Sequence, residues 1–330
     1  MTTITALPLL LIASGTVVML ISILKYKGTI RLANGLLVAD KKAIHRLEKI
    51  HRLLMCFFLG GYLVVLVSLI ANLNIVGNIF TGMIFFFGAV FVFIGILLQS
   101  NMLLSIRENL KEMVSKKNQL LQTENVTIFA LAYLAEIRDQ ETGKHLERTC
   151  QYVKILANEL SLLPKYRSYL THDYISDIIK AAPLHDIGKV GVPDSILLKP
   201  GKLTAEEFEI IKKHCEYGAN ILLAAENKLD FRSFLSIAIK IIMTHHERWD
   251  GKGYPLALKG EETPLSGRIM ALADVYDALI SKRCYKKALS HKETCIIITN
   301  EKGKHFDPEV TEAFLRKEEE FEKISEVMAD

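Results

Sequence analysis

Residues 185–189 read HDIGK, and residues 245–255 read HHERWDGKGYP. The first stretch sets a histidine beside an aspartate, and the second begins with two adjacent histidines. Adjacent imidazole and carboxylate ligands suit Fe, Mn or Zn, and clustered metal ions suit the cleavage of phosphodiesters. These two stretches predict a site for more than one metal ion, and the segments around them have to bring the two together.

Helical patterns surround both stretches. From Thr127 onward the β-branched alternation that is typical of strands is nearly absent, so this part of the chain is predicted to be all-α. Glu207 stands three residues after Thr204 and predicts a capping box at the start of one helix. The expected helices cover residues 129–138, 143–160, 175–187, 205–225, 234–246, 265–281 and 291–300.

Further ligand-type side chains stand on these helices. Glu141 and His145 are four residues apart, so a helix places both on one face. Neighbours such as His185 and Asp186 point about a hundred degrees apart on a helix, so they can bind a metal cluster from two sides. A lone buried histidine is usually structural, but five histidines and three carboxylates on successive helices are hard to explain in that way. The predicted metal ligands are Glu141, His145, His185, Asp186, His214, His245, His246 and Asp274.

The first hundred residues have a different composition. No Asp, Glu, Lys, Arg or His occurs before Lys25, and none occurs between Arg52 and Arg107. Uncharged runs of this length predict membrane-spanning helices, and turn-type residues divide the longer run. Three transmembrane helices are expected, at residues 7–24, 53–73 and 79–98. The alternatives are a soluble protein with buried apolar helices and, for the first run, a cleaved signal peptide.

The distribution of basic residues predicts an orientation. Residues 25–52, between the first two expected spans, carry eight lysines and arginines against two acidic residues. The short loop between the second and third spans carries no charge. By the positive-inside rule the basic segment is cytoplasmic, which places the N-terminus outside and everything after Gln99 inside.

Residues 100–128 are predicted to form a helical linker, with residues 1–99 as the membrane region and residues 129–330 as the C-terminal domain. Two interpretations of the linker stay open. It pairs with its twin in a homodimer as a coiled coil, or it docks on its own domain as a single amphipathic helix. Both rest on apolar residues near heptad spacing, which are Ile106, Leu110, Met113, Leu120 and Leu121.

Two features of the composition limit the function. The net charge of +4 over 330 residues is small, so it gives no argument for binding a nucleic acid polymer. The five cysteines are scattered without a CxxC motif or a paired framework, which fits a reducing compartment and free thiols.

From about Phe129 to Phe314 the chain resembles the HD-GYP domain, a subgroup of the HD phosphohydrolases that cleaves cyclic dinucleotides. The resemblance implies a helical bundle and covers nearly all of the region that follows the expected spans. It departs at Cys215 and Cys284, which stand where proline is common, and neither is a ligand position. The matching motifs are RDQETGKH (138–145), HDIGKVGVPDSILLKPGKLT (185–204), HHERWDGKGYP (245–255), GRIMALADVYDAL (267–279), RCYK (283–286) and GKHFDP (303–308).

The resemblance implies a cofactor and catalytic roles. It assigns the eight predicted ligands to two or three divalent metal ions per chain, Fe or Mn, and a glutamate at the place of Glu141 goes with the three-metal version. Asp186 and Lys189 are the implied catalytic residues. Lys189 would lie by the scissile phosphate, where its ammonium stabilises developing negative charge.

The resemblance also implies substrate contacts. Arg283 and Lys286 would hold the phosphates or the guanine of the substrate, since the planar fork of arginine suits either acceptor. Gly253 and Tyr254 would lie beside the site, where a structural role stays as open as a substrate contact.

The expected function is hydrolysis of cyclic di-GMP to pGpG, GMP or both by an enzyme of the bacterial inner membrane with a cytoplasmic catalytic domain. One alternative is a signalling adaptor that binds the dinucleotide without turnover. Another is an HD phosphohydrolase that acts on a different nucleotide, such as 3′,3′-cyclic GMP-AMP. The intact ligand set favours an enzyme over the adaptor.

Overall fold

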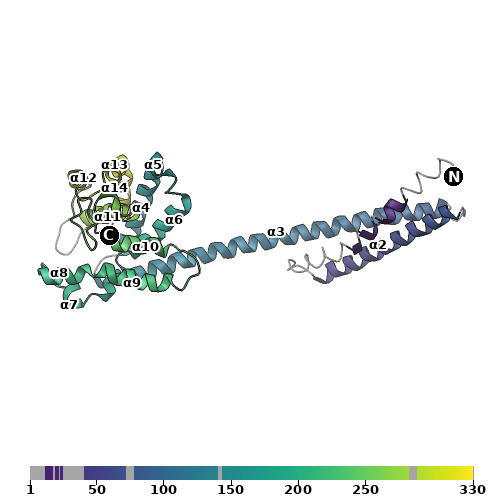
Figure 1. The fold of residues 1–330 in the computed structure, drawn as a ribbon, viewed down its shortest axis with the longest axis horizontal. Helices are drawn as coiled ribbons and strands as arrows, with labels where there is room; N and C mark the ends of the chain where they lie inside the picture. The colour runs from purple at the N-terminus through teal and green to yellow at the C-terminus, as the bar shows by residue number, and fades with distance from the viewer. Residues whose placement is uncertain are drawn as a thin grey trace. The chain divides into compact units, whose positions relative to one another are not determined.

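The computed structural model describes residues 12–17, 19–21, 23–24, 41–71, 78–139, 143–281 and 288–329 (Figure 1). Every regular element among these residues is a helix, apart from one isolated β-bridge between Lys302 and Phe306. The predicted all-α fold is confirmed. The chain divides into two compact units, Met1–Leu120 and Leu121–Asp330, with the boundary inside the predicted linker.

The first unit contains α2 (Lys41–Ile70) and the first part of α3 (Asn78–Glu136). The two helices pack through aromatic rings, and His51 stacks on Phe91 with 4.3 Å between the ring centroids. Among the described residues, one helical stretch, Lys49–Ser68, is long and apolar enough to cross a membrane. It overlaps the second predicted span. The first predicted span includes residues outside the description. The third, residues 79–98, lies within α3, but several of its side chains are outside the description, so both spans stay predictions.

The predicted linker is part of α3, which continues through it without interruption. Apolar side chains on this part of the helix are largely exposed, among them Leu110 at 57% and Met113 at 67%. Most helices in proteins gain their stability from packing an apolar face. The exposed face therefore favours a partner, and the predicted pairing with a second copy stays a prediction.

The second unit is a helical bundle around α4 (Gly143–Ser161), whose Tyr152, Leu156 and Leu160 are fully buried. Its other helices are α5 (Pro164–Arg167), α6 (His172–Ala181), α7 (Asp194–Leu197), α8 (Ala205–Lys212), α9 (His214–Glu226), α10 (Leu235–Thr244), α11 (Leu265–Ile280), α12 (His291–Asn300), α13 (Pro308–Arg316) and α14 (Glu318–Val327). Its 3₁₀ turns are η1 (Ile137–Asp139), η2 (Ala182–Leu184), η3 (Ile187–Gly191) and η4 (Gly260–Glu262). Helix α4 packs against α6, α11, α13 and α14.

Two expected helices are interrupted. The one predicted over 175–187 ends at Ala181 and gives way to 3₁₀ turns, because Pro183 cannot donate a backbone hydrogen bond. The one predicted over 205–225 is split at Lys213 into α8 and α9. The predicted capping box at the start of α8 is confirmed. Both interruptions place a ligand-type histidine next to a helix end.

A close approach between η3 and α9 brings His185 and Asp186, which directly precede η3, near His214 at the start of α9. A Cβ added to Gly188 would lie 1.8 Å from the carbonyl oxygen of His214, so no other residue fits without moving the backbone. Helix α9 in turn packs against α10, and α10 packs against α11. These contacts bring residues that are far apart in the sequence to one place.

Candidate metal centre

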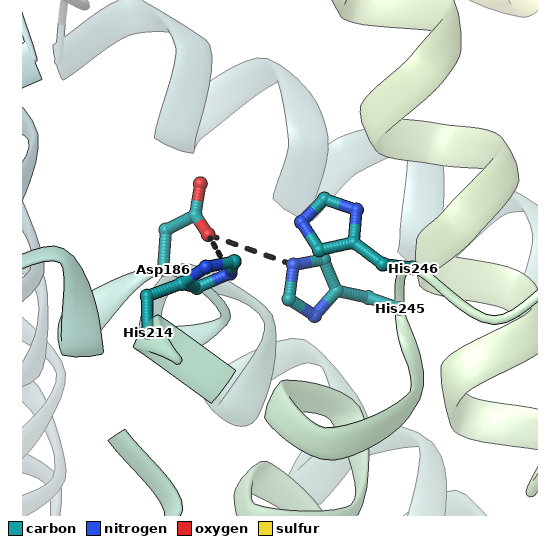
Figure 2. Close-up of side chains that lie close together, drawn as sticks. All are labelled: Asp186, His214, His245 and His246. Atoms are coloured by element: carbon teal, nitrogen blue, oxygen red, sulfur yellow. Dashed lines mark ion pairs between the residues drawn. The ribbon is translucent and has the colours of Figure 1, made fainter. Parts of the chain in front are cut away.

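Asp186 lies at the centre of a group of histidines. Its Oδ1 atom is 3.2 Å from His214 Nε2 and 3.5 Å from His245 Nε2. Figure 2 shows that Asp186 and His214 approach from one side, while His245 and His246 approach from the other, from the end of α10. The ligand atoms of these four residues all lie within 4.8 Å of one another, and we call them the Asp186 group.

A second group adjoins the first. Glu136, His145 and His185 are buried, and their ligand atoms also lie within 4.8 Å of one another; we call them the His145 group. Asp186 connects the two groups, because its Oδ2 atom is 3.4 Å from His185 Nε2. Asp274 stands beside the second group, with Oδ1 3.8 Å from His145 Nε2 and 3.9 Å from His185 Nε2.

Backbone carbonyls orient three of the histidines. A carbonyl only accepts hydrogen bonds, so the Nδ1 atom that faces it carries a proton, and in the neutral imidazole Nε2 keeps its lone pair. Metal-binding histidines commonly have this arrangement, which fixes the tautomer. The three bonds run from His185 to Ala182 (3.0 Å), from His214 to Ile211 (2.7 Å) and from His245 to Ile241 (3.0 Å).

The remaining polar atoms of the centre fit divalent metal ions. His185 Nε2, His245 Nε2 and Asp186 Oδ1 are buried and have no hydrogen-bond partner in the described part of the chain. Burying such atoms without a partner costs free energy, and a cation between them offsets that cost. Imidazole and carboxylate donors suit Fe, Mn or Zn, and two groups that share one carboxylate suit neighbouring ions.

Electrostatics at the Asp186 group favour a cation. Burial alone would raise the pKa of the Asp186 carboxyl, but Lys189, with Nζ 2.7 Å from Oδ2, helps to hold that pKa well below its usual range. Burial lowers the pKa of His214, yet the Asp186 carboxylate outweighs burial and raises this pKa to about 10, so a cation that binds His214 Nε2 displaces a proton from it. Burial holds the pKa of His246 well below its usual range. The ionised carboxylate thus creates a negative field, and the neutral His246 imidazole is in the form that binds metal.

Side chains, rather than carbonyls, orient His145. Its Nδ1 donates to Asp277 Oδ2 at 2.8 Å, and Arg148 donates to both oxygens of the same carboxylate, at 2.7 and 2.9 Å. The three side chains are at most 5% exposed. Asp277 therefore fixes the tautomer of His145 and leaves its Nε2 toward Asp274.

The loop after α10 folds over His246. Tyr254 stacks on this histidine, with 4.6 Å between ring centroids and 29° between ring planes. Glu247 holds the loop, because its buried carboxylate accepts hydrogen bonds from two later backbone N–H groups at 2.7 and 3.1 Å. A Cβ on Gly253 would lie 2.4 Å from a backbone nitrogen, so this position requires glycine.

The structure brings together most of the residues that the sequence singled out. The predicted ligand Glu141 and the predicted substrate residues Arg283 and Lys286 lie outside the described residues and stay predictions. The residues that do meet at the centre are His145, His185, Asp186, Lys189, His214, His245, His246, Gly253, Tyr254 and Asp274.

The sequence reasoning missed three residues of the centre. Asp277 follows Asp274 by one helical turn, and this spacing is a signal that could have found it. Glu247 comes directly after the two histidines, but nothing in its spacing marks it as the anchor of the loop. Glu136 ends α3 and precedes His145 by nine residues, so only the tertiary fold brings the two together.

A further cluster of ligand-type side chains consists of His291, Cys295 and Glu318. All three are only half-buried. Burial and the nearby Glu318 raise the pKa of the Cys295 thiol to about 12, so it stays protonated at neutral pH. The thiolate is the form that binds metal, and this cluster is therefore a weaker candidate than the centre at Asp186.

Comparison with known proteins gives both a family and relatives. Residues 110–310 match the HD domain family. The chain is 53% identical over 225 residues to a cyclic di-GMP phosphodiesterase of Vibrio cholerae. The aligned residues make up 68% of this chain and 46% of that protein. It is 44% identical over 194 residues to a cyclic di-GMP phosphodiesterase of Thermotoga maritima, covering 59% and 49%. It is 41% identical over 224 residues to 3′3′-cGAMP-specific phosphodiesterase 2 of Vibrio cholerae, covering 68% and 40%. The chain spans about half, or less, of the length of these relatives.

Proposed function

The chain belongs to the HD domain family, and we propose that it is a metal-dependent phosphodiesterase of the HD-GYP type that hydrolyses cyclic di-GMP to pGpG, GMP or both. One observation carries the proposal: Asp186 faces His214 and His245 with one oxygen and His185 with the other. A shared carboxylate suits neighbouring divalent ions, and neighbouring ions suit in-line displacement at a phosphodiester. Similarity to cyclic di-GMP phosphodiesterases supports the substrate.

We assign the eight predicted ligands to two or three ions of Fe or Mn, and we add Glu136 because it shares the His145 group. When bound, such ions polarise phosphoryl oxygens and lower the pKa of water. Asp186 fixes the relative positions of His185 and His214, because one of its oxygens contacts each histidine. Lys189, whose Nζ lies 2.7 Å from Asp186, is placed to stabilise negative charge as it develops on the phosphate.

We assign Tyr254 and Gly253 to the border of the substrate pocket. Tyr254 stacks on His246, so its ring lies directly beside the metal centre. Gly253 lets the loop pass close to the backbone that follows His246. Arg283 and Lys286 take the phosphates or the guanine, as the HD-GYP resemblance implies.

The decisive experiment is an assay of the full chain in detergent or lipid nanodiscs, loaded anaerobically with Mn or Fe. We expect turnover of cyclic di-GMP, with pGpG and GMP separated by chromatography and metal content measured in the same samples. Binding of the dinucleotide without turnover by the metal-loaded chain would support the adaptor alternative instead. Faster turnover of 3′,3′-cyclic GMP-AMP would support the other alternative, which similarity to a 3′3′-cGAMP-specific phosphodiesterase favours.

We further propose that three spans anchor the chain in the bacterial inner membrane, with the N-terminus outside and the catalytic domain in the cytoplasm, and that α3 pairs in a homodimer. The apolar stretch Lys49–Ser68 and the exposed apolar face of α3 support this arrangement. A reporter fused to the C-terminus is expected to be active only in the cytoplasm, and a periplasm-active fusion would overturn the orientation. A monomeric mass of the solubilised chain would overturn the dimer.

A further inference from the structure

Two side chains of α8 lie together with the ring of Tyr254. Phe208 and Lys212 are four residues apart on this helix, so both project from one face. The rings of Phe208 and Tyr254 meet edge-on, with 5.9 Å between their centroids. Lys212 Nζ lies 5.4 Å from the centre of the Phe208 ring and 5.7 Å from the centre of the Tyr254 ring. The ammonium group of Lys212 therefore makes a cation–π contact with both rings.

These side chains lie next to the metal centre. Tyr254 stacks on His246, which belongs to the Asp186 group. Lys212 precedes His214 by two residues, so the helix end that carries the lysine leads directly into the ligand-type histidine. Phe208 contacts Tyr254, and Tyr254 contacts His246. A flat group stacked on Phe208 would therefore lie near the metal centre, with the Tyr254 ring between.

Phe208 is open to a ligand. Its side chain is 44% exposed, although large aromatic side chains gain free energy from burial. Lys212 forms an ion pair with Glu209, whose side chain is 67% exposed. An ammonium has three donors, and one surface carboxylate does not use all of them. The pair thus offers an aromatic face and hydrogen-bond donors side by side.

We propose that Phe208 and Lys212 bind one guanine of the cyclic dinucleotide, an inference that rests on the proposed function. The base stacks on the Phe208 ring, and Lys212 donates to the edge of the base. Guanine presents two acceptors there, O6 and N7, whereas adenine presents N7 beside an amino donor. Lys212 therefore selects guanine over adenine at this position.

Kinetics of the full chain with two substrates test the stacking role of Phe208. Phe208→Ala is expected to raise KM for cyclic di-GMP about tenfold or more, while kcat and metal content stay unchanged, because base stacking on an aromatic ring contributes this much to binding. Hydrolysis of bis(p-nitrophenyl) phosphate, a diester without a base, should not change. Phe208→Trp keeps a stacking surface and is expected to retain a KM close to that of wild type.

The selectivity of Lys212 is tested with cyclic di-AMP as a competitive inhibitor. Lys212→Met keeps the alkyl stem but removes the donors. It is expected to raise KM for cyclic di-GMP about five- to tenfold and to leave the inhibition constant of cyclic di-AMP nearly unchanged. Equal weakening of both nucleotides would show that the lysine does not read the base.

Matched controls separate this inference from the proposed function. Phe231 is 68% exposed and Lys228 is also exposed, and both follow the far end of α9, so Phe231→Ala and Lys228→Met should behave as wild type. An unchanged KM in Phe208→Ala, with an active wild-type chain, would overturn the guanine site. A wild-type chain that cleaves bis(p-nitrophenyl) phosphate but not cyclic di-GMP would overturn the proposed function instead.

Discussion

The Asp186 group and the His145 group contain the same kinds of side chain, but the fold orients them by different means. In the Asp186 group, His214 and His245 donate from Nδ1 to carbonyls of the preceding helical turn. In the His145 group, His185 also faces a carbonyl, that of Ala182, but His145 donates to the carboxylate of Asp277, which Arg148 holds from the other side.

This difference determines which group loses the orientation of its histidines when a neighbouring side chain is substituted. Backbone carbonyls are present whatever the neighbouring side chains are, so the orientation of His214 and His245 depends on helix ends alone. The orientation of His145 depends on a buried ion pair, and removing one partner of such a pair is costly. The two groups should therefore be separable by mutation, except at Asp186, which contacts both.

The largest effect is expected at the residue that the two groups share. Asp186→Ala should reduce turnover of cyclic di-GMP to background and lower the metal content of both groups, because buried imidazoles would then face one another without a carboxylate. Turnover and elemental analysis measure this. Asp173→Ala, at an exposed carboxylate on α6, is the matched control and should match wild type. Turnover of Asp186→Ala within a few-fold of wild type would refute the shared role.

A smaller but distinct effect is expected at Asp277. Asp277→Asn removes the charge that balances Arg148 in a site at most 3% exposed, so the free energy of unfolding of the second unit should fall by about 3–5 kcal/mol. The His145 group should lose metal affinity while the Asp186 group keeps it. Denaturant unfolding and metal analysis of the same samples check both effects.

The control for Asp277 is a hydroxyl in the same network. Ser281 contacts both Arg148 and Asp277, and Ser281→Ala should cost only about 1 kcal/mol because neither charge is left unpaired. Equal metal loss from both groups in Asp277→Asn would contradict the separation of the two groups.

A third substitution tests the member that the sequence did not identify. Glu136→Gln keeps the size of the side chain but removes its charge, so metal content should fall by up to one ion per chain and turnover should fall about ten- to hundredfold. The same measurement on Glu141→Gln shows which glutamate completes the His145 group. Unchanged metal content in Glu136→Gln would exclude Glu136 as a ligand.

The contrast between the groups also explains what could be predicted from the sequence. The His185–Asp186 and His245–His246 doublets identified three of the four residues of the Asp186 group, because ligands that are adjacent in sequence are adjacent in space. Glu136 and Asp277 were not predicted, because burial and tertiary packing rather than local spacing make them part of the centre. The pairing of Asp277 with Arg148 depends on the packing of α11 against α4, which no local pattern specifies.

The sequence predicted the fold class and most of the helices, but not where two of the helices are interrupted. Helical periodicity gave the all-α class and most of the helices, since it reports which face of each helix is buried. Periodicity did not show that residues 182–191 form 3₁₀ turns, and the effect of Pro183 on this segment was not anticipated. The break at Lys213 leaves no composition signal, because its backbone stays in the helical region on both sides.

The smallest expected effect concerns the loop beside the Asp186 group. Glu247 accepts two backbone hydrogen bonds from this loop, whereas glutamine offers only one acceptor oxygen, so Glu247→Gln should lower the free energy of unfolding by roughly 1–2 kcal/mol. Because the loop carries Tyr254, KM for cyclic di-GMP should rise a few-fold. Metal content should not change, since His245 and His246 precede the loop and His245 is oriented by a carbonyl within α10. Loss of metal in Glu247→Gln would show that the loop helps to hold the Asp186 group, and the contrast between the backbone-oriented His214 and His245 and the side-chain-oriented His145 would then be incomplete.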